Sequence, residues 1–198
     1  MPRFLKTCHS LEFEIGSSEN PAKDLQTKRY DFVIMAGADS VKDNDCDYLP
    51  LFADQLVCVM PADHPLSSRS YVHFEDFARF NMISHSEKAQ NRFYNVCLKP
   101  KGLEPRRFMT VGQPHAMIEM VASGFGISVF PRWAITGFLE TIGITARPIT
   151  RIGLPVTWYA TLLKNRQVPA FQHEFLNIIS KLNPVDLPAE AGRMPAGF

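Results

Sequence analysis

The sequence predicts an α/β protein of two lobes joined by two crossing segments. Segments with strand character alternate with helical segments along most of the 198 residues, which is typical of sheets built from βαβ units. The apolar run Leu51–Met60 is interrupted only by Asp54 and Gln55, and the two-proline turn Pro61–Pro65 follows it. Near the other end of the chain, Val156–Leu163 alternates as a strand does and is expected to cross back.

Short elements are expected before the first crossing, and a second helix-strand series after it. The first set is helix Pro2–His9, strand Leu11–Ile15, helix Pro21–Lys28 and strand Tyr30–Met35, followed by a polar, acidic loop over residues 36–50. The second set is helix Phe74–Phe80, strand Asn81–His85, helix Ala89–Leu98, strand Arg107–Val111, a helix opened by Gln113, strand Ile127–Phe130 and helix Trp133–Glu140. Residues 146–155 read as a loop with one short extended piece, and Pro169 opens a last helix with Phe171, Phe175, Ile178, Ile179 and Leu182 on its buried side.

The order of these elements predicts the lobe boundaries. Residues 1–60 and 164–182 are expected to form the first lobe, and residues 61–163 the second. A right-handed crossover needs a strand on each side of its helix, so a chain that begins with a helix is expected to be N-terminally truncated and to lack the first strand. Residues 183–198, rich in Pro, Ala, Gly and Glu, are expected to be a disordered tail.

The stretch Gln113–Trp133 is the most informative part of the chain. Ala116, Met117, Met120 and Val121 form one apolar stripe on a helix that ends at Gly124 and Gly126, and the apolar run Ile127–Phe130 then suits a parallel strand covered on both faces. Ligands bind open α/β sheets at the carboxyl ends of their strands, so the helix start and the strand end are expected to line a crevice. Taken alone, such a helix-strand-helix unit is usually ordinary core.

Composition and motifs exclude several functions. Lysine and arginine number 21 against 20 acidic residues, so the chain lacks the basic field of a DNA-binding domain. The phosphate-loop, dinucleotide, serine-hydrolase and zinc-protease motifs are absent from the sequence, which disfavours an enzyme and predicts no cofactor. Six scattered histidines and four widely spaced cysteines predict no metal site. With no secretory signal or 18-residue apolar span, a cytoplasmic protein without membrane contact is expected.

Four segments in register resemble one family. They are Tyr-Asp-Phe-Val-Ile (30–34), Pro-Ala-Asp-His-Pro-Leu (61–66), Phe-Glu-Asp-Phe-Ala (74–78) and Met-Val-Ala-Ser-Gly-Phe-Gly-Ile-Ser-Val-Phe-Pro (120–131). Together they resemble the effector-binding domain of LysR-type bacterial transcriptional regulators, over the chain to about residue 182. The resemblance implies a two-lobed, type 2 periplasmic-binding-protein-like fold that binds a small effector between its lobes and thereby modulates DNA binding and transcription. A solute-binding protein of a transport system shares this architecture and is the alternative; a small enzyme is a third.

Two further strings narrow the resemblance. Cys-Leu-Lys-Pro-Lys-Gly-Leu-Glu-Pro (97–105) and Phe-Pro-Arg-Trp (130–133) resemble the subgroup that regulates methionine biosynthesis, which implies homocysteine or a related amino acid as effector. The family implies a homodimer or tetramer. It also implies that DNA is contacted only through a winged helix-turn-helix domain, which this sequence lacks.

Carrying the family's pocket over by position gives nine candidate ligand contacts. They are Ser17, Ser18, Ala36, Gly37, His85, Gln113, Pro114, His115 and Phe130. Small residues, hydroxyls and amides suit an amino-acid head group, and an aromatic wall suits its tail. Ser17 and Ser18 could instead cap the helix at Pro21, and His85 and His115 could be ordinary loop histidines.

Overall fold

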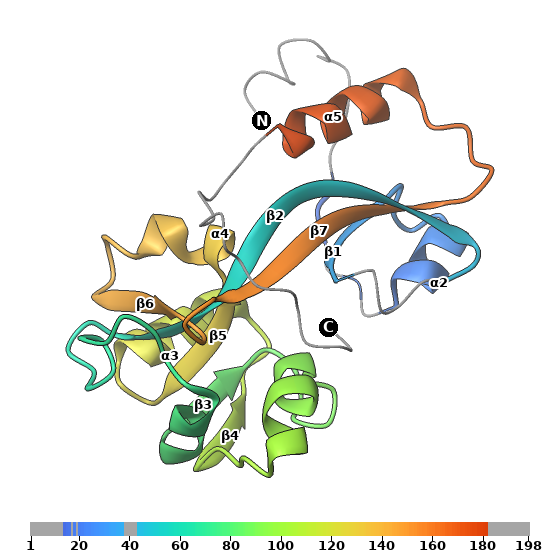
Figure 1. Cartoon of the computed structure of the whole chain (residues 1–198). Coiled ribbons are helices and arrows are strands. Elements are labelled where there is room, and N and C mark those ends of the chain that lie inside the picture. The colour runs from blue at the N-terminus through green and yellow to red at the C-terminus, as the bar shows by residue number, and fades with distance from the viewer. Residues whose placement is uncertain (1–13, 17, 19, 38–42, 182–198) are drawn as a thin grey trace. The chain divides into compact units, whose positions relative to one another are not determined.

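A computed structural model describes residues 14–16, 18, 20–37 and 43–181, and these form two compact units. One unit holds the described residues up to 53 and those from 157 to 181, and the other holds residues 54–156. The chain enters the second unit within strand β2 (Cys46–Pro61) and leaves it within β7 (Leu154–Leu163) (Figure 1). The division between the two units therefore falls inside these strands.

In the first unit, helix α5 (Ala170–Ser180) packs against β7 and the start of β2, and β1 (Val33–Ala36) is the neighbour of β7 in the sheet. β1 pairs antiparallel with β7, and Val33 lies opposite Thr161. The helix α2 (Pro21–Gln26) starts after Asn20, whose side chain accepts a hydrogen bond from the Lys23 N–H at 3.2 Å. The core of this unit centres on four buried residues: Leu51, Ala160, Leu162 and Leu176.

Two predictions about the first unit need correction. Residues 46–50, predicted to be loop, begin β2: Cys46 is buried while Asp47 is exposed, so the acidic residues that indicated a loop include the solvent face of a strand. In α5 the buried residues are Gln172 and Leu176, and the predicted core residue Phe171 is 37% exposed. The predicted helix Pro2–His9 and most of the predicted strand Leu11–Ile15 lie outside the described residues.

The second unit is built on a mixed sheet in the order β2-β5-β3-β4. β3 (Asn81–Ser84) pairs parallel with β4 (Arg107–Thr110) and with β5 (Ile127–Pro131). β5 pairs antiparallel with β2, and β6 (Ile144–Pro148) pairs antiparallel with the other edge of the same stretch of β2. Sequence analysis expected only one short extended piece where β6 lies.

Helices cover both faces of this sheet because successive strand residues point to opposite sides. On one face Cys58, Met60 and Met82 pack with a 3-10 helix, η2 (Phe74–Arg79), and with the helical segment that ends in the π-helical turn η3 (Tyr94–Leu98). On the other face Val57, Val59 and Ile83 pack with α3 (Pro114–Ala122) and α4 (Arg132–Ile135). The prediction that the strand after Gly126 is covered on both faces is confirmed.

The ends of two helices differ from the prediction. The segment predicted as helix Trp133–Glu140 is the single turn α4 followed by a 3-10 turn, η5 (Thr136–Phe138). The helix expected from Ala89 begins at residue 92, after Asn91. The turn that precedes β5 also lies close to β3. A Cβ on Gly126 would be 2.5 Å from the Asn81 carbonyl oxygen, so only glycine fits there.

Candidate functional site

The carboxyl ends of β3 and β4 lie side by side in the second unit. Ser84 and Thr110, the last residues of the two strands, are opposite each other in the parallel register. The Val111 N–H then donates to the Ser84 carbonyl at 2.8 Å and extends the pairing by one bond. The segments that leave the sheet here carry His85 on one strand and Gln113 on the other, so these two candidate residues leave the same edge.

A buried polar network holds the segment after β3. The Asn91 side-chain amide donates to the Ser84 hydroxyl oxygen at 2.8 Å, and the Ser86 N–H donates to the same oxygen at 3.2 Å. The Asn91 side-chain oxygen accepts from the Tyr94 N–H at 2.7 Å, the geometry of a helix N-cap. Ser84 is 3% exposed and Asn91 7%. Asn91 therefore joins the strand end to the start of the next helix.

Sequence reasoning missed Asn91 as a site residue. Because the helix was expected to start at Ala89, Asn91 was placed inside the helix and was not recognised as the residue that precedes it. The available signal was the residue type, since asparagine is preferred at helix N-caps.

The start of α3 presents the other half of this edge. Gln113 has extended backbone (φ −120°) and Pro114 occupies the first turn, which carries no acidic residue. The first N–H groups of a helix have no intrahelical acceptor and carry partial positive charge, so this end suits a carboxylate. Gln113, Pro114 and His115 are all exposed.

The two candidate histidines are exposed and differ in their surroundings. The His115 ring nitrogen Nε2 lies 3.8 Å from a Glu119 carboxylate oxygen one turn along α3, and its ring centroid lies 6.0 Å from that of Phe138. His85 directly follows Ser84, the residue that the buried network holds. Either imidazole could donate to or accept from a ligand at this edge.

Phe130 reaches the same edge of the sheet but its side chain faces inward. It is 6% exposed, lies opposite Val57 in the register of β2 and β5, and packs in the core that α3 and α4 cover. Phe130 therefore has the surroundings of a core residue, and its packing holds the last residues of β5 in place.

The candidate residues of the first unit lie at the ends of its elements. The Ser18 hydroxyl donates to an Asp24 carboxylate oxygen at 2.6 Å, while Asn20 rather than Ser18 caps α2. Ala36 ends β1 opposite Trp158, and Gly37 follows with φ +66° and donates its N–H to the Thr157 carbonyl at 3.0 Å. Ser17 lies outside the described residues.

The described part of the chain contains no group of three or more His, Cys, Asp and Glu side chains placed to hold a metal ion. Over the same residues, the helices are too short or too polar to cross a membrane.

The carboxyl edge presents the start of α3, two exposed imidazoles and the turn at Ser84–Ser86, which hydrogen bonds hold in place. These are recognition groups for a small polar ligand.

Comparison with known proteins agrees with this geometry. The sequence model of the LysR substrate binding domain matches residues 1–182. The HTH-type transcriptional regulator MetR of Haemophilus influenzae is 27% identical over 179 residues, which cover 90% of this chain and 57% of that protein. This chain thus spans little more than half the length of that relative.

Solved structures give the same assignment. The regulatory domain of MetR from N. meningitidis superposes with a TM-score of 0.74 at 27% identity, covering 91% of this chain and 83% of that one. The CcmR regulatory domain from Synechocystis, solved in complex with 2-PG, has a TM-score of 0.74 at 19% identity over 92% of this chain and 88% of its own, and shows the shared fold alone. The predicted α/β, periplasmic-binding-protein-like fold is confirmed, and the chain belongs to the LysR substrate-binding domain family, with MetR among its relatives.

Proposed function

We propose that this chain senses a small amino-acid effector on behalf of a LysR-type transcriptional regulator. The observation that carries the proposal is the carboxyl edge of the second unit, where the start of α3 and the turn braced by Asn91 leave the sheet together. The helix start suits the effector's carboxylate, and Gln113, His85 and His115 supply hydrogen-bonding partners for its polar groups. Ser18, Ala36 and Gly37 are proposed contacts from the first unit.

Homocysteine or a related amino acid is the proposed effector. The support is the similarity to MetR in both sequence and structure. Effector binding changes DNA contacts only if the effector binds one arrangement of the regulator more tightly than another. With 21 basic against 20 acidic residues, this chain has no strong positive field of its own, so we place the DNA contacts in another domain of a homodimeric or tetrameric, cytoplasmic regulator.

The alternatives have less support. A transport-type solute-binding protein and a small enzyme would use the same kind of fold, but the MetR proteins to which this chain is similar are transcriptional regulators. Regulators of this kind are not enzymes, and the residues described at the carboxyl edge are explained by ligand binding without a catalytic role.

Thermal unfolding in the presence of candidate effectors tests the proposal. A ligand at about a hundred times its Kd stabilises the folded state by about 2.7 kcal/mol, or roughly 5 to 10 °C for a chain of this size. We expect homocysteine to raise the Tm, and Gln113→Ala to abolish the increase without lowering the Tm of the free protein. Gln167→Ala removes another exposed glutamine and serves as the matched control.

Two outcomes would count against parts of this proposal. If homocysteine does not raise the Tm, and another amino acid or an aromatic carboxylate raises it in the parent protein but not in Gln113→Ala, the effector is misassigned. If both Gln113→Ala and His115→Ala respond as the parent protein does, the site is misplaced.

A further inference from the structure

A hollow lies at the opposite edge of the sheet from the candidate effector site. It encloses about 400 Å³, within the usual range for small-molecule sites, and opens between the residues that precede β3, β4 and β5. Phe80, Arg106 and Phe125 stand at these three strand starts. We call this hollow the amino-edge pocket, because the candidate effector site lies at the carboxyl ends of the same strands.

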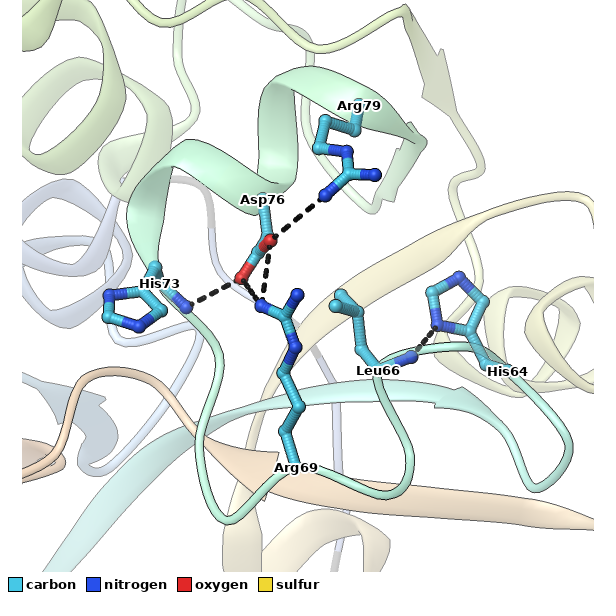
Figure 2. A network of polar contacts seen from close by, with 6 residues as sticks. All are labelled: His64, Leu66, Arg69, His73, Asp76 and Arg79. Atoms are coloured by element: carbon cyan, nitrogen blue, oxygen red, sulfur yellow. Dashed lines mark hydrogen bonds and ion pairs between the residues drawn. The ribbon is translucent and has the colours of Figure 1, made fainter.

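Arg79 and Arg106 line the amino-edge pocket, and among the described residues neither guanidinium forms a close ion pair with a carboxylate. The carboxylate nearest to Arg79 is that of Asp76, which has another partner. Asp76 is 5% exposed, and Arg69 satisfies it with contacts of 3.1 and 2.9 Å from one guanidinium nitrogen (Figure 2). The His73 N–H adds a third hydrogen bond at 3.0 Å. Arg79 stands 3.9 Å from the same carboxylate with its side chain 67% exposed, so that pair adds little.

Arg106 is freer still. Its backbone N–H donates to the Phe80 carbonyl at 3.0 Å, and across the part of the chain that the structure describes its guanidinium has no ion pair. Among the lining residues Asp63 is the only carboxylate, set against two guanidiniums. The pocket therefore favours a negatively charged ligand.

The remaining wall is aromatic. Phe125 is 56% exposed, although its backbone is fixed by a 2.9 Å hydrogen bond from the Asn81 side chain to its carbonyl. Phe80 packs against the His64 ring with centroids 4.5 Å apart. An exposed phenylalanine held on a rigid turn gains apolar burial when a ligand covers it.

We propose that the amino-edge pocket binds a small organic anion, with its charged group between Arg79 and Arg106 and its apolar body against Phe125. Guanidinium groups recognise planar oxyanions by paired hydrogen bonds, and the aromatic wall selects a ligand with a ring or chain over a simple ion. The inference stands apart from the proposed effector site, since the two sites share no residue.

Titration of the 198-residue chain, followed by backbone amide NMR, tests the proposal with three probes. Benzoate supplies both charge and ring, benzamide keeps the ring without the charge, and acetate keeps the charge without the ring. We expect benzoate to shift the amide signals of Gly124, Phe125 and Gly126. Benzamide should bind at least about tenfold more weakly, the loss expected for one charge-assisted hydrogen bond. Acetate should also bind at least about tenfold more weakly, because it has no ring to cover Phe125.

Variants separate this pocket from the other site. Arg106→Gln is expected to weaken benzoate binding about tenfold. Arg107→Gln removes the adjacent exposed arginine, which does not line the pocket, and is expected to leave binding unchanged. Gln113→Ala, which tests the effector site, is also expected to leave benzoate binding here unchanged.

Three results would overturn the inference. Equal binding of benzamide and benzoate would remove the role of the arginines, and equal binding of acetate would remove that of the aromatic wall. Signal changes confined to His85 and residues 113–115 would assign benzoate to the effector site instead.

Discussion

Asn91 shows how much of the carboxyl edge depends on one side chain. Its amide donates to Ser84 and its oxygen caps the helix that starts after it. Asn91→Ala removes both bonds and leaves a buried hydroxyl short of one partner, so we expect a loss of about 1 to 3 kcal/mol in the free energy of unfolding. Urea denaturation measures the loss.

Two substitutions frame this prediction. Asn91→Asp keeps the capping oxygen and is expected to retain part of the stability. Asn95→Ala removes an exposed side-chain bond to the Ala89 carbonyl and should cost less than Asn91→Ala. Equal losses for Asn91→Ala and Asn95→Ala would show that the buried network contributes nothing specific.

His64 links stability to pH. Burial lowers the pKa of this imidazole, against the opposing effect of the Asp63 charge, and its Nδ1 accepts from the Leu66 N–H at 3.2 Å. The unfolded chain, in which His64 keeps its ordinary pKa near 6.5, then binds the proton more tightly than the folded chain. The contribution of His64 is therefore complete above about pH 6.5 and is lost as the pH falls towards the folded-state pKa.

The variant His64→Asn tests this linkage because the asparagine oxygen can still accept from Leu66. We expect its unfolding free energy, measured by urea denaturation between pH 7.5 and 5, to fall less on acidification than that of the parent protein. Parallel pH profiles for the two proteins would contradict the assignment.

At the level of single residues, the sequence predicted positions better than roles. The residues at the carboxyl edge could be found because a strand end and a proline-started helix leave recognisable patterns. The burial of Phe130 could not, since strand alternation does not say which face holds the larger core. The bond from Asn91 to Ser84 also depends on tertiary packing that no local pattern encodes.

Among the elements, the turn before β5 is the most constrained. A Cβ on Gly126 would lie 2.5 Å from the Asn81 carbonyl oxygen, which belongs to the backbone of β3 and cannot move aside as a side chain can. We expect Gly126→Ala to destabilise the protein by about 1 to 3 kcal/mol, the range for overpacking.

Gly137→Ala is the matched control for that substitution. Nothing lies within 4 Å of the Cβ position at Gly137, so alanine there is expected to be neutral or slightly stabilising. Thermal denaturation of the two variants gives the comparison. A Gly126→Ala protein as stable as Gly137→Ala would show that the contact between the turn and β3 relaxes easily.

Elements with strong local sequence patterns were predicted well, whereas the start of β2 and the buried face of α5 were predicted less well. The strand β5, the stop after α3 and the turn after Pro61 follow glycine, proline and apolar runs that act locally. The start of β2 was wrong because exposed aspartates on a strand read like a loop. The buried face of α5 was predicted in part: Ile179 packs against the core and Phe175 contacts Phe32, whereas Phe171 is 37% exposed and the buried residue Leu176 was missed.

For the whole molecule, the cysteines can report on the two units separately. Burial raises the pKa of the Cys97 thiol to about 12 and raises that of Cys58 further, and burial with nearby aspartates raises that of Cys46. All three described cysteines are buried, so they should resist thiol reagents in the native state. Cys46 belongs to the first unit and the other two to the second.

Thiol labelling at increasing urea, in a Cys8→Ser background, tests whether the units unfold independently. Among the described residues, the core around Leu176 is much smaller than the two cores of the second unit. We therefore expect Cys46 to react at a lower urea concentration than Cys58 and Cys97. Simultaneous reaction of all three would mean that both units unfold in one transition.

The path of β2 restricts which length changes the sequence can accept. One uninterrupted strand contributes Leu51 to one core and, a few residues later, Val57 and Cys58 to two other cores on opposite faces of the sheet. Deleting a single residue between Leu51 and Val57 would exchange inward and outward side chains on one side of the deletion, whereas deleting two would preserve the alternation. Insertions and deletions of two residues in this strand should therefore be tolerated better than those of one residue.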